Sequence, residues 1–237
     1  MGLGRHRAAR QDDGRGVNKP VAQALVLDFG GVISKTLFET HDLTEQVLGL
    51  APCTLKWLGP FAPDSDPLWV SMQRGEISER DYWLTRSREV GHMLGEDWPD
   101  METFVKRARG ADPATVIRPE ADHAIRIVDD AGFKLAILSN ELDLFYGADF
   151  RARLPVLARF DTIIDATHTH ILKPDPRAYH SVLDALALAA EDCVFVDDQR
   201  RNIAGAAACN MRTVLFDVRN PKASYGEALR HFGLEFD

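Results

Sequence analysis

The sequence predicts an α/β fold, in which a doubly wound and mostly parallel sheet carries an inserted all-helical domain. Short, continuous apolar runs alternate with stretches of helical pattern along most of the chain. Continuous runs suit strands that are buried on both faces of a parallel sheet, and the alternation suits strands joined by helical crossovers. The alternation is interrupted once, between the first two runs, by roughly eighty residues with helical patterns and no strand. These observations indicate one sheet and one helical insertion.

Five segments have the length of strands and are rich in Val, Ile, Leu and Phe. In chain order they are "ALVLDFG" (24–30), "FKLAILSNE" (133–141), "FDTIIDAT" (160–167), "CVFVDD" (193–198) and "MRTVLFD" (211–217). Each run ends in polar residues, so the chain leaves the apolar interior at these points.

Three helical patterns separate the later strands. The first, "RPEADHAIRIVDDAG" (118–132), has Pro119 near its start and Gly132 just past its end, as is usual for a helix. The other two are "DPRAYHSVLDALALAAED" (175–192) and "RRNIAGAAACN" (200–210). Helices between successive strands produce right-handed crossovers in one parallel sheet.

The insertion shows its own helical signals. "SERDYWLTRSREV" (78–90) opens with Ser78 and Asp81 in a capping-box arrangement. The segments 42–50 and 100–110 are also predicted to be helices. All four tryptophans fall in the insertion, where they are expected to pack its small core or to form a substrate platform. They are Trp57, Trp69, Trp83 and Trp98.

The composition is that of an ordinary globular protein, with 45% apolar and 27% charged residues. A net charge of -8 argues against a general nucleic-acid binder, which needs clustered Lys and Arg. No apolar run has the length of a membrane span and no secretory signal is visible, so a cytoplasmic monomer or homodimer without nucleic-acid or membrane partners is expected. The three widely spaced cysteines indicate reduced thiols.

Residues 1–20 are rich in Gly and Arg and have almost no bulky apolar residues. Such a segment buries too little apolar surface to offset the entropy of ordering, so a mobile tail is predicted. A start-site artefact, a targeting arm and a nucleic-acid-contacting arm are the alternatives.

Polar residues with complementary chemistry follow four of the predicted strands. They are Asp28, then Ser139 with Asn140, then Lys173, then Asp197 with Asp198. Because the carboxyl ends of parallel strands meet at one edge of the sheet, these side chains are expected to converge. Three carboxylates in one place repel one another, and Mg²⁺ is the hard cation that such a group is expected to hold.

This set of residues suits phosphoryl chemistry. The cation and Lys173 would neutralise a phosphoryl group, while Ser139 and the backbone N–H groups near Gly30 and Gly31 would bind its oxygens. Asp28 could then attack phosphorus and form an aspartyl phosphate.

Four segments of the chain resemble the four motifs of the haloacid dehalogenase superfamily, most of whose members are phosphatases. They are "VLDFGGV", "AILSN", "KPDPRAY" and "VFVDDQRRNIAGA", which occur in the superfamily's order and each at a strand end. The resemblance spans about residues 22–217 and implies a Rossmann-like core with a helical cap of the first type. The expected domains are a core formed by residues 21–36 and 114–237, and a cap formed by residues 37–113.

The resemblance also implies roles for individual residues. Asp28 is expected to be the nucleophile, and the backbone carbonyl of Gly30 is expected to bind Mg²⁺. Ser139 and Asn140 are expected to hold the transferring group, while Lys173 balances its charge.

The fourth motif supplies the remaining roles. Asp198 is expected to bind the metal directly, and Asp197 either to bind it as well or to lie just behind it. Asn202 matches a polar position that supports this site in phosphatases resembling the amino-terminal domain of soluble epoxide hydrolase, so it is expected on the substrate side.

One position departs from the motif pattern. Most phosphatases of the superfamily have a second aspartate two residues after the nucleophile, which protonates the leaving oxygen and later activates water; here that position is Gly30. Glycine also occurs there in members that resemble sugar-phosphate phosphatases. The candidate replacements are His41, Asp42, His168 and His170. The last two alternate along the chain, so on a strand they would share one face.

The expected function is therefore that of a magnesium-dependent hydrolase of a small phosphomonoester, acting through an aspartyl phosphate on Asp28. A metal-independent 2-haloacid dehalogenase is the first alternative, since that branch also lacks the second aspartate. The fourth motif of the dehalogenase branch, however, carries polar residues where this chain has the acidic pair Asp197 and Asp198. The second alternative is a binding or regulatory protein with little turnover because of Gly30.

Overall fold

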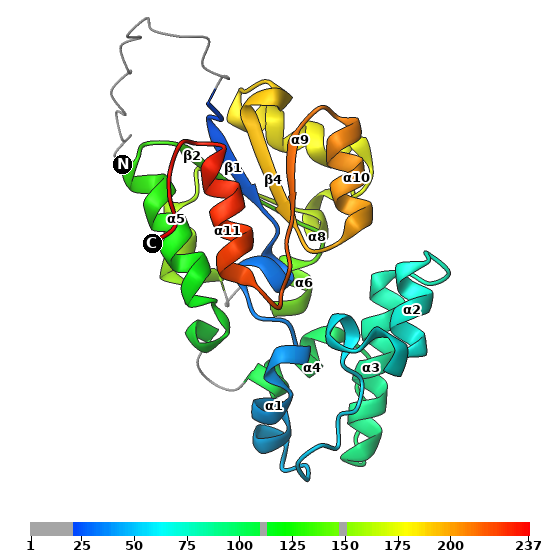
Figure 1. Cartoon of the computed structure of the whole chain (residues 1–237). Coiled ribbons are helices and arrows are strands. Elements are labelled where there is room, and N and C mark those ends of the chain that lie inside the picture. Colours follow the sequence, from blue (N-terminus) through cyan, green and yellow to red (C-terminus); the bar gives the residue numbers. More distant parts are fainter. Residues whose placement is uncertain (1–20, 110–112, 147–150) are drawn as a thin grey trace, which may run out of the picture.

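The computed structural model describes residues 21–109, 113–146 and 151–237. Residues 1–20, for which a mobile tail is predicted, lie outside this range. Among the helices of these segments, none is both long and apolar enough to cross a membrane. The described chain forms one sheet of five strands, with helices on both faces and a further group of helices at one end (Figure 1).

All five predicted strands are present in the sheet. Their bounds are β1 (Ala24–Leu27), β2 (Lys134–Ser139), β3 (Thr162–Asp165), β4 (Cys193–Asp197) and β5 (Arg212–Leu215). The spatial order is β3-β2-β1-β4-β5, and every neighbouring pair is parallel. The doubly wound α/β fold predicted from the sequence is therefore confirmed.

Strand β1 lies at the centre, where the direction of strand addition reverses. Leu27 pairs with Ile137 of β2 on one side and with Val196 of β4 on the other. The chain first extends from β1 through β2 to β3 and then crosses back to β4 and β5. In such sheets ligands bind in the crevice beyond the carboxyl ends of the strands at this reversal. Asp28, the first residue after β1, stands at that crevice.

Helices cover both faces of the sheet (Figure 1). On one face, α5 (Pro119–Asp130) and α11 (Pro221–Arg230) share an apolar cluster with Leu25 and Leu27 of β1. On the other face, α9 (Pro176–Leu186) and α10 (Arg200–Ala208) share a second cluster with Ala24 and Val26. Two short helices, α6 (Leu142–Tyr146) and α8 (Ala166–Thr169), follow β2 and β3. The alternating side chains of β1 thus face two separate apolar layers.

The helices of the insertion lie beyond the carboxyl end of the sheet, and this group is called the cap below (Figure 1). They are α1 (His41–Leu48), α2 (Pro67–Gln73), α3 (Glu79–Met93) and α4 (Met101–Arg109). An antiparallel bridge between Ser34 and Ile117 joins the two chain segments that lead into and out of this group. The described residues of the insertion contribute no strand to the sheet, in agreement with its helical patterns.

Aromatic rings fill the interior of the cap. The ring centroid of Phe38 lies 5.6 Å from that of Trp57 and 5.2 Å from those of Trp69 and Trp83. These three indoles and that of Trp98 are buried. The predicted packing role of the tryptophans is confirmed.

Polar side chains fix the turn between α2 and α3. The predicted capping box is present, since Ser78 Oγ accepts a hydrogen bond from Asp81 N and the Asp81 carboxylate accepts one from Ser78 N. The buried carboxylate of Asp66, which precedes α2, accepts hydrogen bonds from the Tyr82 hydroxyl at 2.7 Å and from Arg86 at 2.5 Å. These contacts tie the first half of α3 to the residue that precedes α2.

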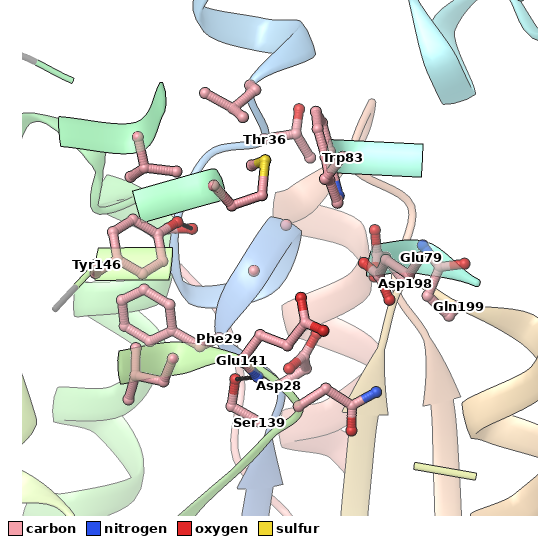
Figure 2. Close-up of a pocket in the computed structure, with 18 of the residues that line it drawn as sticks. Asp28, Phe29, Thr36, Glu79, Trp83, Ser139, Glu141, Tyr146, Asp198 and Gln199 are labelled. Atoms are coloured by element: carbon pink, nitrogen blue, oxygen red, sulfur yellow. Dashed lines mark hydrogen bonds between the residues drawn. The ribbon is translucent and has the colours of Figure 1, made fainter. Parts of the chain in front are cut away.

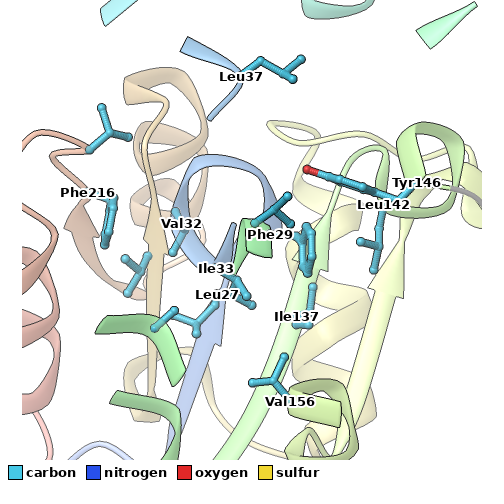
Figure 3. Close-up of a cluster of buried hydrophobic side chains, with 14 of the residues drawn as sticks. Leu27, Phe29, Val32, Ile33, Leu37, Ile137, Leu142, Tyr146, Val156 and Phe216 are labelled. Atoms are coloured by element: carbon cyan, nitrogen blue, oxygen red, sulfur yellow. The ribbon is translucent and has the colours of Figure 1, made fainter. Parts of the chain in front are cut away.

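The chain turns sharply after β1 through residues Phe29–Ile33. The side chains of Phe29, Val32 and Ile33 are buried in the core, and the Phe29 ring lies 5.3 Å from the Tyr146 ring (Figure 3). Gly31 has a φ of 78°, a left-handed conformation that favours glycine. Apolar anchoring of this loop fixes the backbone beside Asp28.

Candidate active site

A cleft between the carboxyl end of the sheet and the cap contains the predicted site residues. Its lining includes Asp28, Gly30, Gly31, Ser139, Asn140, Lys173, Asp198 and Asn202. Asp197 lies beneath this surface and is fully buried. The empty volume of the cleft, including the part open to solvent, is about 790 Å³. Residues from four separate segments of the sequence are thus brought together.

The ammonium group of Lys173 bridges two carboxylates. Its Nζ lies 2.9 Å from Asp28 Oδ1 and 2.7 Å from Asp197 Oδ2, and the lysine side chain is 1% exposed. Because both carboxylates surround a buried cation, the Lys173 ammonium is held in its charged form at the end of β1. The ion pair fixes the position of the predicted nucleophile.

The residues at the end of β2 support this arrangement. Asn140 Oδ1 accepts a hydrogen bond from Lys173 N at 2.7 Å, and Asn140 Nδ2 donates to Lys173 O at 3.2 Å. The side-chain amide predicted to hold the transferring group thus holds the backbone of Lys173. Ser139 is nearly buried beside Asp28, and its Oγ accepts a hydrogen bond from Glu141 N at 3.4 Å (Figure 2).

Donors of the protein surround the carboxylate of Asp197. Its Oδ1 accepts hydrogen bonds from Gln199 N at 2.7 Å and from Asn202 Nδ2 at 3.1 Å, and its Oδ2 accepts from Lys173 Nζ. Both oxygens are therefore in use, and the carboxylate connects Lys173 to the start of α10. Asn202 lies in the cleft lining while its amide nitrogen is directed to Asp197.

Asp198 lies against the loop that follows β1. A Cβ atom added to Gly31 would come within 2.8 Å of Asp198 Oδ2, so only a glycine leaves room for this carboxylate. Asp28, Asp197 and Asp198 each offer a carboxylate oxygen within 4.8 Å of the others. Of the adjacent acids, Asp198 is the one whose side chain faces the cleft.

The electrostatics of this acidic group suit a divalent cation. Burial raises the pKa of Asp28 to about 7 in spite of the nearby Lys173 ammonium, and burial together with Asp197 and Asp28 raises the pKa of Asp198 well above its ordinary value. A cation beside these oxygens stabilises their charged forms, and carboxylate oxygens are the ligands that Mg²⁺ prefers. The donor set therefore fits magnesium, which Asp28 and Asp198 would bind through their carboxylate oxygens.

Two further acids in the cleft lining were not identified from the sequence. Glu79, the first residue of α3, accepts a hydrogen bond from Arg201 of α10 at 3.1 Å. Glu141, which directly follows Asn140, accepts one from Arg80 Nε at 2.5 Å. Both ion pairs join the cap to the core. Only the position of Glu141 next to the "SN" pair offers a sequence signal, because the docking of α3 depends on the tertiary structure.

The histidines suggested as proton donors are not among the cleft-lining residues. The ring of His41 packs against Trp57 inside the cap, with centroids 4.4 Å apart. His168 Nε2 lies 2.7 Å from Asp143 Oδ2. The expectation that His168 and His170 share a strand face is wrong, because Asp165 caps Thr167 N and the chain enters the short helix α8 there.

Apolar side chains form another wall of the cleft. They are Phe29, Leu37, Phe38, Trp69, Trp83, Met101, Val105, Leu142 and Tyr146. Trp69 and Trp83 therefore both pack the cap and face the cleft. The Tyr146 hydroxyl is within 3.2 Å of Ser34 Oγ, which turns the ring's polar end toward the loop after β1. The acidic end of the cleft is thus continuous with an apolar one.

The sequence of the chain is similar to those of known hydrolases. A family model described as haloacid dehalogenase-like hydrolase matches residues 5–210. The chain is 28% identical to Phosphatase MT3486 of Mycobacterium tuberculosis over 202 residues, which cover 82% of this chain and 87% of that protein. It is 34% identical to Protein CbbY, plasmid, of Cupriavidus necator over 209 residues, covering 81% and 77%.

A longer relative and a solved structure complete the comparison. The chain is 27% identical to Acyl-CoA dehydrogenase family member 10 of Mus musculus over 172 residues, which are 72% of this chain but 16% of that protein. The fold resembles that of the putative HAD-hydrolase YfnB from Bacillus subtilis bound to magnesium, with a TM-score of 0.68 and 15% identity, covering 91% of this chain and all of that one.

Proposed function

The chain belongs to the haloacid dehalogenase-like hydrolases, and from that membership we propose that it is a magnesium-dependent phosphatase of a small phosphomonoester with an apolar organic group. The observation that carries the proposal is the placement of Lys173 Nζ 2.9 Å from Asp28 Oδ1, beside the open carboxylate of Asp198. A carboxylate nucleophile, a fixed cation and a second carboxylate for a metal ion are the groups that phosphoryl transfer through an aspartyl phosphate needs.

In the proposed reaction, an oxygen of Asp28 attacks phosphorus and the bond to the leaving oxygen breaks. The Lys173 ammonium holds the attacking carboxylate in place and donates to a phosphoryl oxygen. The Ser139 hydroxyl and the backbone N–H groups of the loop at Gly30 and Gly31 donate to the remaining oxygens. Mg²⁺, when bound, supplies positive charge that offsets the charge of the phosphoryl group. Water then hydrolyses the aspartyl phosphate and restores Asp28.

The apolar wall supports an apolar organic group on the substrate. Side chains such as Leu142, Met101 and Trp83 offer little to the hydroxyl groups of a sugar, whereas burial of a hydrocarbon against them is favourable. The basic residues in the lining are Lys35 and Lys173, and Lys173 is already paired with two carboxylates. A second phosphate on the substrate is therefore not favoured.

The same electrostatics disfavour the dehalogenase alternative. A 2-haloacid brings a carboxylate of its own, and the cleft lining already contains Glu79 and Glu141 in addition to Asp28 and Asp198. Like charges in a partly buried site destabilise one another. A phosphoryl group avoids this conflict because it binds together with a divalent cation.

The test is a screen of the purified chain against alkyl, aryl and sugar phosphates, with MgCl₂ and with a chelator, beside a halide-release assay on 2-haloacids. We expect phosphate release that requires Mg²⁺ and has its highest kcat/KM on alkyl or aryl phosphates. Halide release that survives chelation would support the dehalogenase instead. Binding of Mg²⁺ and of a phosphate mimic without turnover of any compound would favour a binding or regulatory protein.

A further inference from the structure

Glu141 occupies an unusual position for a carboxyl group. Its side chain is 5% exposed, yet it lines the same cleft as Asp28. Figure 2 shows it directed into the cleft beside Asp28 and Ser139. Its Oε1 accepts the hydrogen bond from Arg80, whereas its buried Oε2 has no hydrogen-bond partner among the residues that the structure describes. An unpaired buried carboxyl oxygen costs free energy unless a ligand or a proton completes it.

The surroundings of Glu141 favour a proton on this carboxyl group. The pKa of Glu141 is raised to about 7, with burial as the largest cause and the negative charge of Glu79 as the second. The positive charges of Arg80 and Arg201 act in the opposite direction. The charged groups Asp28, Lys173 and Asp198 face the cleft from the strand ends. Near neutral pH both the acid and its conjugate base are populated, which is the condition for acid and base catalysis by one group.

We propose that Glu141 is the general acid and base of this site, in the role for which Gly30 offers no side chain. The inference rests on the proposed phosphatase function. It rests further on three facts about the geometry: Glu141 follows shortly after β2, next to β1, it lines the cleft, and its Oε2 has no hydrogen-bond partner among the described residues.

The proton balance of the reaction is complete with this residue. As Asp28 attacks phosphorus, the bond to the leaving oxygen breaks and Glu141 transfers its Oε2 proton to that oxygen, which departs as an alcohol. The resulting Glu141 carboxylate takes a proton from the water that attacks the aspartyl phosphate. Inorganic phosphate leaves, and both Asp28 and protonated Glu141 are restored. No further reactant is needed.

Glu79 is the nearest competitor for this role. It is the first residue of α3, where the helix dipole favours the charged form of a carboxylate. Its side chain is 27% exposed, and its Oε2 is occupied by the hydrogen bond from Arg201. Burial raises the pKa of Glu79 as well, and the Arg201 guanidinium acts in the opposite direction. The competition is therefore decided by pairing, since the Arg201 hydrogen bond occupies Glu79 Oε2 whereas Glu141 Oε2 has no partner among the described residues.

The experiment compares Glu141→Gln with Glu79→Gln on two classes of substrate. An alkyl phosphate has a poor leaving group and needs a proton, whereas p-nitrophenyl phosphate does not. We expect Glu141→Gln to lower kcat/KM for the alkyl phosphate by about 10²–10⁴-fold and for p-nitrophenyl phosphate by less than about tenfold. We also expect a burst of p-nitrophenol followed by slow turnover, because water attack on the aspartyl phosphate loses its base.

Loss of packing or of the Arg80 ion pair would lower the activity on the alkyl phosphate and on p-nitrophenyl phosphate alike. A loss that depends on the leaving group therefore indicates proton transfer by Glu141 and not a structural role. Glu141→Asp keeps a carboxyl group and should retain more alkyl phosphatase activity than Glu141→Gln; it also serves if the Gln variant folds poorly. Equal losses on the two substrates, or the leaving-group effect in Glu79→Gln instead, overturn the role of Glu141 alone. A wild-type chain that hydrolyses no phosphomonoester overturns the proposed function and this inference together.

Discussion

Lys173 and Asp197 form an ion pair that is almost completely removed from solvent, with the lysine Nζ 2.7 Å from the aspartate Oδ2. The same ammonium reaches Asp28 at 2.9 Å. Asp197 also accepts hydrogen bonds from Gln199 N and Asn202. It therefore connects Lys173, the partner of Asp28, to the start of α10. The two adjacent acids after β4 thus have different surroundings, and their substitutions are expected to act differently.

Asp197→Asn and Asp198→Asn form a matched pair. Asp197→Asn weakens a buried ion pair and is expected to reduce the free energy of unfolding by about 3–5 kcal/mol. Asp198→Asn removes a carboxylate that has no ion pair with a cation like Lys173. Without Mg²⁺ the variant should be at least as stable as the wild type, and added Mg²⁺ should stabilise it little. Urea unfolding with and without MgCl₂ measures both effects. Equal destabilisation of the two variants would contradict the distinction.

The two glycines after Phe29 differ in the room they leave. Gly31 has a φ of 78° and its missing Cβ would lie 2.8 Å from Asp198 Oδ2, so Gly31→Ala is expected to displace that carboxylate and to cost about 1–3 kcal/mol of stability. Gly30 has a φ of -68° with nothing within 4 Å of its Cβ position, so Gly30→Ala should fold normally and serve as the control. Isothermal titration with Mg²⁺ should show weaker binding for Gly31→Ala only. Unchanged affinity in that variant would argue against Asp198 as a metal ligand.

The open space beside Gly30 allows a proton donor to be restored. In the Glu141→Gln background, Gly30→Asp is expected to recover at least about tenfold in kcat/KM for an alkyl phosphate, because it places a carboxyl group two residues after Asp28. Gly30→Ala in the same background should recover nothing. Failure of the aspartate to restore activity in a variant that still binds Mg²⁺ would count against a missing proton donor as the defect.

The titration of Glu141 predicts how the free energy of unfolding depends on pH. Its pKa of about 7 in the folded chain is above the ordinary value of 4.5, so between these values the unfolded chain releases the proton first and stability falls as the pH rises. Glu141→Gln lacks this titration, so its stability relative to the wild type should increase by on the order of 3 kcal/mol between about pH 5 and about pH 8. Urea unfolding of both proteins at the two pH values gives the difference. A difference that does not depend on pH would mean that Glu141 titrates normally.

The sheet and most of the site were predictable because both follow from local patterns. Continuous apolar runs define β1 to β5, and polar residues after them must meet where parallel strands end together, as Asp28 and Lys173 do. Three of the cap helices, α1, α3 and α4, were predicted, and α3 was marked by the capping signal of Ser78 with Asp81, whereas α2 was not predicted.

What the sequence did not reveal depends on tertiary contacts. The docking of α3 onto the core places Glu79 and Arg80 at the cleft, and no local pattern marks that contact. Helix α11 was not predicted, because its residues Pro221–Arg230 mix polar and apolar side chains and include a central glycine. Its buried face becomes apparent only where it packs beside α5.

The central claim is that Asp28 becomes phosphorylated during turnover. The most direct measurement is to mix the chain with Mg²⁺ and a phosphomonoester, quench with acid, digest, and find the phosphoryl group by mass spectrometry. The account predicts a phosphoryl group on the peptide that contains Asp28, with more of it in Glu141→Gln, and none in Asp28→Asn, which should also have no turnover. Turnover in Asp28→Asn at an undiminished rate, or steady turnover with Asp28 never modified, would contradict it.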